Sequence, residues 1–175
     1  MNNVGVCWGT GLFDTELDDF DWVMRTNLRN PWFLTRRLVQ ELLRARRPGS
    51  ILFISSLHEE VVSRRPQYSM SKAGVSMAVR ELAAAMGPRG IRVNAISPGW
   101  ISNGAVELSK ASRMISQIPL GRPGNPDDVA KLAIFLLSDA CSGYLTGADI
   151  PVDGGMLLRS WIPEDEPSPY RTSSR

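Results

Sequence analysis

The sequence has 175 residues, of which 43% are hydrophobic and 22% charged, and its 20 basic and 18 acidic residues leave a net charge of +2. These values are typical of a globular protein that forms one domain or part of one, and they exclude a disordered chain, a collagen and a disulfide scaffold. The near-neutral charge gives no electrostatic reason to expect a nucleic acid or an anionic membrane as a partner.

The first third of the sequence predicts two helices and a buried strand. Apolar residues recur at three- and four-residue steps from about Thr15 to Thr26, behind a group of acidic residues that suits a helix N-terminus. Pro31 is expected to open a second helix that runs to about Arg46. The continuous apolar run from Ser50 to Ser55 then predicts a strand that is buried on both faces.

The rest of the sequence continues the alternation of strands and helices. A polar loop over 57–66 leads into a long helix from about Gln67 to Met86, which is rich in small residues. A second strand is expected over Ile91 to Ile96, a helix over Pro126 to about Ser138, and a third strand over Asp149 to Val152.

This alternation predicts an α/β fold with a doubly wound parallel sheet, because parallel strands need crossover connections. Ligands in such folds bind at the carboxyl ends of the strands. The segments expected there are Ser55-Ser56, Pro98-Gly99 and Asp153-Gly154-Gly155.

Tyr68 and Lys72 form the first candidate for chemistry. They lie four residues apart on a predicted helix, so they share one helix face. A nearby ammonium group stabilises a phenolate and lowers the pKa of the tyrosine, which can then exchange a proton with an alcohol or carbonyl oxygen. The same spacing also fits an unremarkable tyrosine and lysine on a solvated face.

Ser56 and His58 stand in the loop before that helix. Ser56 ends the buried strand, and its hydroxyl can hold a substrate oxygen against Tyr68, although a serine there can equally cap a turn. His58 and Glu59 can face a substrate or form an ordinary solvent-facing pair. A Ser-His-acid hydrolase is excluded, since neighbouring residues of one loop do not give triad geometry and no Gly-x-Ser-x-Gly elbow is present.

The cysteine and histidine content gives no reason to expect a metal site. Cys7 and Cys141 are far apart, and His58 is the single histidine of the sequence. The cysteines are expected to be reduced thiols of a cytoplasmic protein. The sequence shows no signal-peptide pattern and no apolar run long enough for a membrane helix.

Six segments resemble motifs of the short-chain dehydrogenase/reductase family, in the family's order and over residues 2 to about 158. Tyr68-Ser69-Met70-Ser71-Lys72 fits the Tyr-x-x-x-Lys motif, and Ile54-Ser55-Ser56 resembles the strand end that carries the active-site serine. The other four matches are Asn2-Asn3-Val4-Gly5, Asn27 within Arg25 to Leu28, Arg92-Val93-Asn94 with Pro98-Gly99, and Gly147-Ala148-Asp149 through Asp153-Gly154-Gly155.

The resemblance implies a hydride-transfer enzyme that interconverts an alcohol and a carbonyl with NAD or NADP. Tyr68 would be the general acid/base, Lys72 would lower its pKa and bind the nicotinamide ribose, and Ser56 would orient the substrate. Asn27 would position a water in a proton relay. His58 would face the substrate, as in sugar-oxidising members with a similar Ser-Ser-x-His-Glu run. The cofactor-binding residues would be Asn3, Gly5, Tyr68, Lys72, Pro98, Gly99, Ile101 and Asn103, with Asn103 where the family usually has threonine.

The resemblance also implies that residues 1–160 are the C-terminal part of a single Rossmann-type dehydrogenase domain. The proline and serine content of 161–175 predicts a disordered tail. The family's Thr-Gly-x-x-x-Gly-x-Gly turn and the strands around it are expected to precede residue 2, so the N-terminal cofactor-binding strands are missing from the sequence. Gly9-Thr10-Gly11 is interpreted as a loop. A homo-tetramer or dimer built on the helices 31–46 and 67–86 is expected. The alternative is a non-catalytic truncated remnant without a dinucleotide phosphate site, acting if at all by docking to related subunits.

Overall fold

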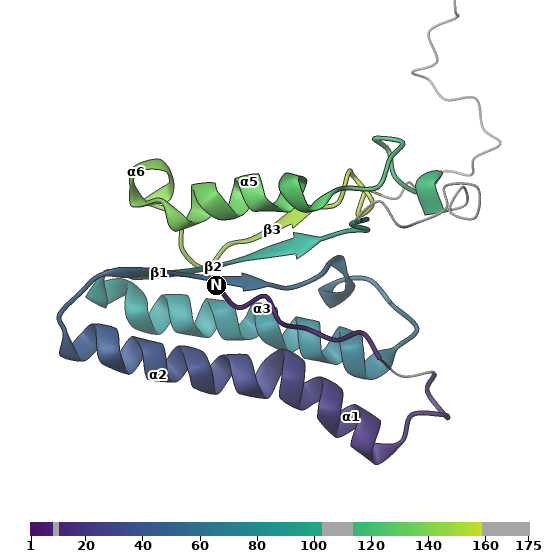
Figure 1. The fold of residues 1–175 in the computed structure, drawn as a ribbon, viewed down its shortest axis with the longest axis horizontal. Coiled ribbons are helices and arrows are strands. Elements are labelled where there is room, and N and C mark those ends of the chain that lie inside the picture. Colours follow the sequence, from purple (N-terminus) through teal and green to yellow (C-terminus); the bar gives the residue numbers. More distant parts are fainter. Residues whose placement is uncertain (9–10, 103–113, 159–175) are drawn as a thin grey trace, which may run out of the picture.

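A computed structural model describes residues 1–8, 11–102 and 114–158 (Figure 1). The expected Asn103 and the expected disordered tail therefore lie outside the described residues. Within them, three parallel strands form one sheet in the order β1-β2-β3. The strands are β1 (Gly49–Ile54), β2 (Ile91–Pro98) and β3 (Asp149–Val152). All three lie where the sequence predicted them, within two residues.

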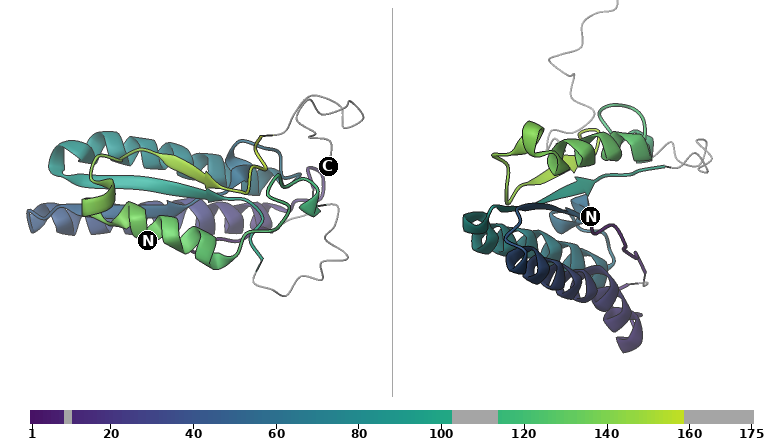
Figure 2. Two further views of the ribbon diagram at one scale, coloured as in Figure 1. Left: turned by 90° about the horizontal axis from the view of Figure 1, so that it is seen from above. Right: turned by 60° about the vertical axis from the view of Figure 1, so that its left-hand side comes forward.

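Helices cover both faces of the sheet (Figures 1 and 2). On one face lie α1 (Leu17–Met24), α2 (Asn30–Arg44) and α3 (Pro66–Met86), and on the other lie α5 (Pro126–Leu137) and the short α6 (Asp139–Ser142). This layered arrangement confirms the predicted α/β class, with three strands in the described part of the chain. None of the helices described has the length and apolar character that crossing a membrane requires.

The two helices predicted before β1 are in fact continuous, which corrects the sequence interpretation. A π-helical turn, η1 (Arg25–Arg29), joins α1 to α2, and Pro31 sits in the first turn of α2. Pro31 has no N–H to donate, and its ring would clash with a regular preceding turn. The wider π turn accommodates it without breaking the helix.

Two apolar clusters hold the layers together. The first packs Phe53 and Val93 of the sheet against Val79 of α3 and Val39 of α2. The second packs Leu52 and Ile96 against Ala133 and Leu136 of α5. Because successive strand residues point to opposite faces, Leu52 and Phe53 belong to different clusters. This explains why the strands have continuous apolar runs and no alternation.

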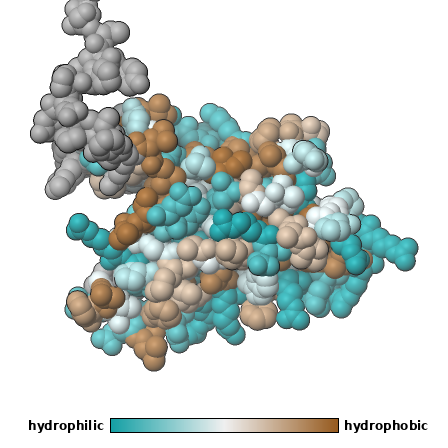
Figure 3. All heavy atoms as spheres, turned by 180° about the vertical axis from the view of Figure 1, so that it is seen from behind, coloured by the Kyte–Doolittle hydropathy of each residue, from teal (hydrophilic) through white to brown (hydrophobic). Residues whose placement is uncertain are grey.

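Along the free edge of β1, the described residues form a single isolated bridge. Asn2 pairs with Phe53 in parallel, through hydrogen bonds from the Asn2 amide to the Leu52 carbonyl (2.7 Å) and from the Ile54 amide to the Asn2 carbonyl (2.9 Å). The rest of that edge has no neighbouring strand among the described residues. Apolar side chains are also exposed on several elements, including Phe33, Leu34 and Leu38 of α2. Figure 3 shows apolar patches among polar ones on one face of the molecule.

The segment between β1 and α3 carries a short helix that was predicted as a polar loop. It is the 3₁₀ turn η2 (Leu57–Glu59), and Ser56 caps it by accepting a hydrogen bond from the His58 amide (3.2 Å). A second 3₁₀ turn, η3 (Gly87–Arg89), ends α3, and Gly90 takes the left-handed conformation that only glycine adopts easily. Ser56 therefore lies directly before η2, in the segment that connects β1 to α3.

Candidate active site

A cavity of about 880 Å³ lies at the carboxyl ends of β1 and β2. It brings together residues from the start of the chain, the end of β1, the first turns of α3 and the turn after β2. Eight of the predicted site residues line it: Asn3, Gly5, Ser56, Tyr68, Lys72, Pro98, Gly99 and Ile101. Residues more than ninety positions apart in the sequence thus meet where a parallel α/β sheet places its ligands.

Tyr68 and Ser56 both line the cavity. Burial of the Tyr68 ring raises the tyrosine pKa above its usual value, and this effect outweighs the neighbouring Ser56 hydroxyl, which lowers it. This differs from the lowered pKa expected from the Tyr-Lys pair. The phenol is therefore protonated at neutral pH and can donate its proton to an oxygen held beside Ser56.

Lys72 lies one turn further along α3 and is 5% exposed. Its Nζ donates to the Ile54 carbonyl (2.9 Å) and lies 5.8 Å from the centre of the Tyr68 ring. Burial lowers the pKa of Lys72 to about 8, while the nearby Cys7, Glu59 and Asp149 oppose the shift. The ammonium is still charged at pH 7, so it can stabilise a negative charge that develops on the phenol.

Asn27 lies behind the cavity, in the π turn, and is 2% exposed. Its Oδ1 accepts from the Val6 amide (2.8 Å), and its Nδ2 donates to the Val6 carbonyl (2.8 Å) and to Ser71 Oγ (3.0 Å). The side chain therefore fastens the first residues of the chain to α3. π turns often occur at functional sites, and here the turn puts a polar side chain inside the helix layer.

Removing the Asn27 amide should cost about 3 kcal/mol of unfolding free energy, because the Val6 amide and carbonyl would lose their partners in a partly buried place. We expect this loss for Asn27→Ala in urea unfolding. Asn30→Ala, at an exposed asparagine of α2, is the matched control and should change the unfolding free energy little. A cost below about 0.5 kcal/mol for the alanine variant would contradict this role.

His58 lies beside the catalytic candidates but does not line the cavity. Its ring centre is 6.0 Å from that of Tyr68, at an interplanar angle of 70°, and its Nδ1 contacts the Val61 carbonyl (3.2 Å). A carbonyl can only accept, so Nδ1 carries the proton and Nε2 is left as an acceptor in the neutral ring.

Two glycines of the cavity lining let neighbouring protein groups approach the backbone closely. A Cβ at Gly5 would lie 3.4 Å from Lys72 Nζ and 3.5 Å from Asn27 Oδ1, and a Cβ at Gly99 would lie 2.7 Å from the Asp153 Cα. The cavity volume, the charged lysine and these bare backbone positions fit the nicotinamide half of a dinucleotide. The residues present are therefore compatible with the cofactor that the sequence resemblance implies.

A methyl group at Gly99 should disturb this site, because the nearest atom is backbone that cannot easily move. We expect Gly99→Ala to lower the unfolding free energy by about 1–3 kcal/mol, as overpacking does. Gly87→Ala is the matched control, since no atom lies within 4 Å of its Cβ position. Thermal unfolding of the two variants checks the contrast, and equal stabilities would contradict it.

Several residues of the site were missed by the sequence analysis. The cavity is also lined by Cys7, by Trp100, and by Val129, Ala133, Ile134 and Leu137 of α5. The Arg65 guanidinium donates to Cys7 Sγ (3.3 Å). Gln67, 1% exposed, donates to the Trp8 carbonyl (2.8 Å) and so ties the first segment of the chain to α3 next to Tyr68. In the sequence, the sign of this role was a polar residue, Gln67, directly before Tyr68 in the predicted helix.

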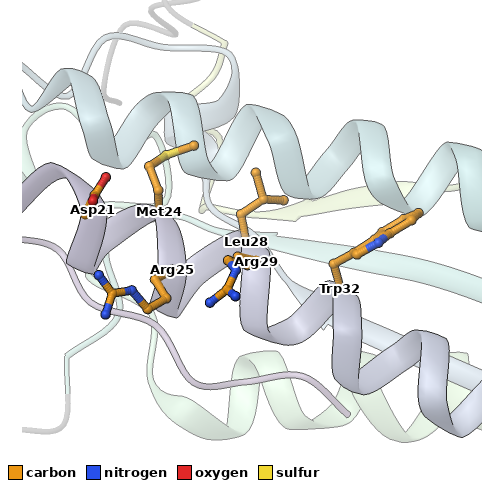
Figure 4. Close-up of a pocket in the computed structure, with 6 residues that line it drawn as sticks. All are labelled: Asp21, Met24, Arg25, Leu28, Arg29 and Trp32. Atoms are coloured by element: carbon orange, nitrogen blue, oxygen red, sulfur yellow. The ribbon is translucent and has the colours of Figure 1, made fainter.

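A second cavity, of about 630 Å³, lies along the α1-η1-α2 helix and contains none of the predicted residues. In Figure 4, Met24, Leu28 and Trp32 project toward the neighbouring α3, whereas Arg25 and Arg29 point away from it. Leu28 and Trp32 pack on the apolar core. This hollow is a groove between packed helices and lacks convergent polar groups. Within the described residues, no three His, Cys, Asp or Glu side chains group together as a metal site.

Comparison with known proteins gives consistent matches over most of the chain. A family model described as enoyl-(acyl carrier protein) reductase matches residues 1–157. The FixR protein of Bradyrhizobium diazoefficiens is 40% identical over 166 residues, covering 90% of this chain and 59% of that protein. An L-rhamnose 1-dehydrogenase (NAD(P)(+)) of Azotobacter vinelandii is 35% identical over 164 residues, covering 90% of this chain and 64% of that protein.

The fold has matching solved structures as well. A short-chain type dehydrogenase/reductase from Mycobacterium marinum shares it with a TM-score of 0.82 and 30% identity, over 90% of this chain and 63% of that structure. The chain thus spans about 60% of the length of the proteins it matches.

Proposed function

The chain belongs to the short-chain dehydrogenase/reductase family, an oxidoreductase family, and on that premise we propose that its cavity interconverts an alcohol and a carbonyl compound with NAD or NADP. One observation carries the proposal: Ser56, Tyr68 and Lys72 line a single cavity. The substrate is a small-molecule alcohol or carbonyl.

In the proposed reaction the side chains manage the proton. For reduction, the Ser56 hydroxyl orients the carbonyl oxygen, and the protonated phenol of Tyr68 donates to it. The Lys72 ammonium stabilises the resulting phenolate. For oxidation, the same phenolate takes the proton from the alcohol. When bound, the nicotinamide supplies or accepts the hydride.

The residues around the cavity have distinct places in this proposal. Lys72 would bind the nicotinamide ribose, and the remaining cofactor contacts would come from Asn3, Gly5, Tyr68, Pro98, Gly99, Ile101 and Asn103. Asn27 would position a relay water: its Oδ1 and Lys72 Nζ both lie within 3.5 Å of the point where a Gly5 side chain would begin. The Nε2 atom of His58 would accept a hydrogen bond from a substrate hydroxyl group.

A second candidate function is that of a non-catalytic remnant that docks to related subunits. The observation favouring it is the edge of β1, where only Asn2 is paired. An exposed strand edge is a template for pairing with another chain. We propose a cytoplasmic location for the protein under either candidate function.

Dinucleotide binding distinguishes the proposed dehydrogenase from the non-catalytic remnant. Isothermal calorimetry with NAD and with NADP should give binding by one or both under the first proposal, and it also shows which dinucleotide is preferred. The measurement is made on the 175-residue chain and on any longer product of the same reading frame. No binding by any form that contains the cavity would favour the remnant.

We also propose that the chain assembles as a homo-dimer or tetramer through α2 and α3. Exposed apolar side chains on these helices, among them Leu34 and Leu38 of α2 and Met77 of α3, suit such an interface. Light scattering at micromolar concentration should show an oligomer, and Leu34→Glu with Leu38→Glu should shift it toward the monomer. A wild-type monomer would contradict the proposal.

A further inference from the structure

Directly behind Ser56 lies a polar cluster that the mechanism does not use. It consists of three serines and two acids from four parts of the fold: Ser55, Glu59, Ser76, Ser97 and Asp149, here called the serine-carboxyl cluster. The three serines are 2–5% exposed. Ser55 precedes η2 and Glu59 is its last residue, while Ser76 lies on α3, Ser97 on β2 and Asp149 on β3.

Four oxygen-oxygen contacts join hydroxyls to carboxyls in this cluster. Glu59 Oε2 contacts Ser55 Oγ (2.7 Å) and Ser76 Oγ. Asp149 Oδ2 contacts Ser76 Oγ (2.7 Å), and Asp149 Oδ1 contacts Ser97 Oγ (2.6 Å). Ser76 contacts both carboxyls, so both acids approach the same hydroxyl group.

Counting protons shows that one is missing if both acids are ionised. Each hydroxyl carries one proton, so three serines can satisfy three of the four contacts. Ser76 cannot donate to both carboxyls, and an unprotonated hydroxyl oxygen against a carboxylate oxygen is repulsive. The fourth contact, and the approach of the two acids, require a proton on a carboxyl group.

We propose that the Glu59 carboxyl carries a proton at neutral pH, and that its pair with Asp149 is a positioning element that fixes the Ser56–Glu59 turn against α3 and β3. The carboxyl of Glu59 then donates to Ser76 while accepting from Ser55, and Ser76 donates to Asp149. Each of the four hydroxyl-carboxyl contacts then has one proton. The turn that carries Ser56 and His58 is held from behind by a network that only a neutral Glu59 completes.

The charges around the cluster agree with this assignment. Burial raises the pKa of Glu59, and the neighbouring Asp149 carboxyl raises it further, whereas Ser76 and Ser55 lower it. Lys72 is the cation facing the pair from α3, and both acids raise its pKa. His58 is the titratable neighbour on η2 itself, with its ring turned to the Val61 carbonyl.

The consequence for catalysis rests on the proposed function. Ser55 Oγ also contacts the Lys72 carbonyl (3.3 Å), so the cluster ties the residue before Ser56 to the helix that carries Tyr68 and Lys72. Ionisation of Glu59 would put two adjacent negative charges behind the turn and loosen it. Misplacement of catalytic groups by about 1 Å can cost roughly 100-fold in rate.

The proton itself is measured by infrared difference spectroscopy of the 175-residue chain between pH 5 and 8. We expect a protonated-carboxyl C=O band, equivalent to one group, that persists at pH 7 where exposed carboxyls are ionised. Glutamate labelled with ¹³C in its side-chain carboxyl should shift the band in the wild-type chain. Glu59→Gln should abolish it, and Glu41→Gln, at an exposed carboxyl of α2, should leave it unchanged.

Absence of the band at pH 7, or its persistence in Glu59→Gln, would overturn the acid pair. The measurement needs no cofactor or substrate, so it can fail while the proposed reaction stands, and an intact band without hydride transfer would refute only the reaction. If Glu59→Gln does not fold, the isotope shift in the wild-type chain decides the question alone.

Turnover numbers of Glu59 variants distinguish a positioning role of Glu59 from a purely structural one. Gln keeps a donor and an acceptor and mimics the neutral acid, so Glu59→Gln should retain kcat within a few-fold. Glu59→Ala should lower kcat by about 10- to 100-fold. Equal losses in the two variants would contradict the role of a neutral Glu59.

Discussion

Tyr68→Phe is expected to lower turnover by at least about 100-fold while dinucleotide binding changes little. Only the phenolic oxygen is lost, and the residue that carries it lines the cavity together with Ser56. The ring keeps its packing at the start of α3. Steady-state kinetics, paired with calorimetric titration of the cofactor, measures the two effects separately in a protein that contains this chain.

Tyr144→Phe is the matched control for that experiment. Tyr144 is fully exposed beside α6 and lines none of the cavity, so its loss should leave kcat unchanged. Turnover in Tyr68→Phe within a few-fold of the wild type would remove Tyr68 from the proton-transfer role.

Lys72→Met should abolish turnover to a similar degree and change how stability depends on pH. The pKa of Lys72 falls from 10.5 in the unfolded chain to about 8 in the folded one, because the ammonium is buried. Between pH 8 and 10.5 the unfolded state therefore binds more protons than the folded state, and stability rises with pH. The full displacement corresponds to about 3 kcal/mol.

Chemical denaturation at several pH values between 7.5 and 10.5 measures this slope. The wild-type chain should gain free energy of unfolding over the window relative to Lys72→Met, which has no proton to release. Lys131→Met, on the exposed side of α5, should keep the wild-type slope. Parallel curves for the wild type and Lys72→Met would mean that Lys72 keeps its ordinary pKa.

The strands and the long helices were predictable because their signals are local. The continuous apolar run before Ser55 and the small-residue helix after Gln67 specify their elements with no help from distant contacts. The break predicted before Pro31 was wrong, since a π turn is a response to neighbouring packing that no short window of sequence reveals. The turn η2 was missed for a similar reason: its cap is a single hydroxyl, that of Ser56.

The cavity followed from topology more than from any single residue. Ser56 and Pro98 could be placed together because parallel strands share their carboxyl edge. Tyr68 was added to them on the resemblance to the short-chain dehydrogenase/reductase family. The pKa of Tyr68 could not be foreseen, because it depends on how much water the folded chain excludes. Glu59 and Asp149 are ninety residues apart, and only the paired strands and α3 bring their carboxyls together.

The most direct test of the account follows a hydride. A protein containing this chain is incubated with NAD or NADP and a panel of alcohols and sugars that carry deuterium on the oxidisable carbon, and the dinucleotide is analysed by mass spectrometry. The account predicts deuterium in the reduced nicotinamide with at least one alcohol, and none when Tyr68 is phenylalanine. Failure of every alcohol to label either dinucleotide, or undiminished labelling by Tyr68→Phe, would contradict it.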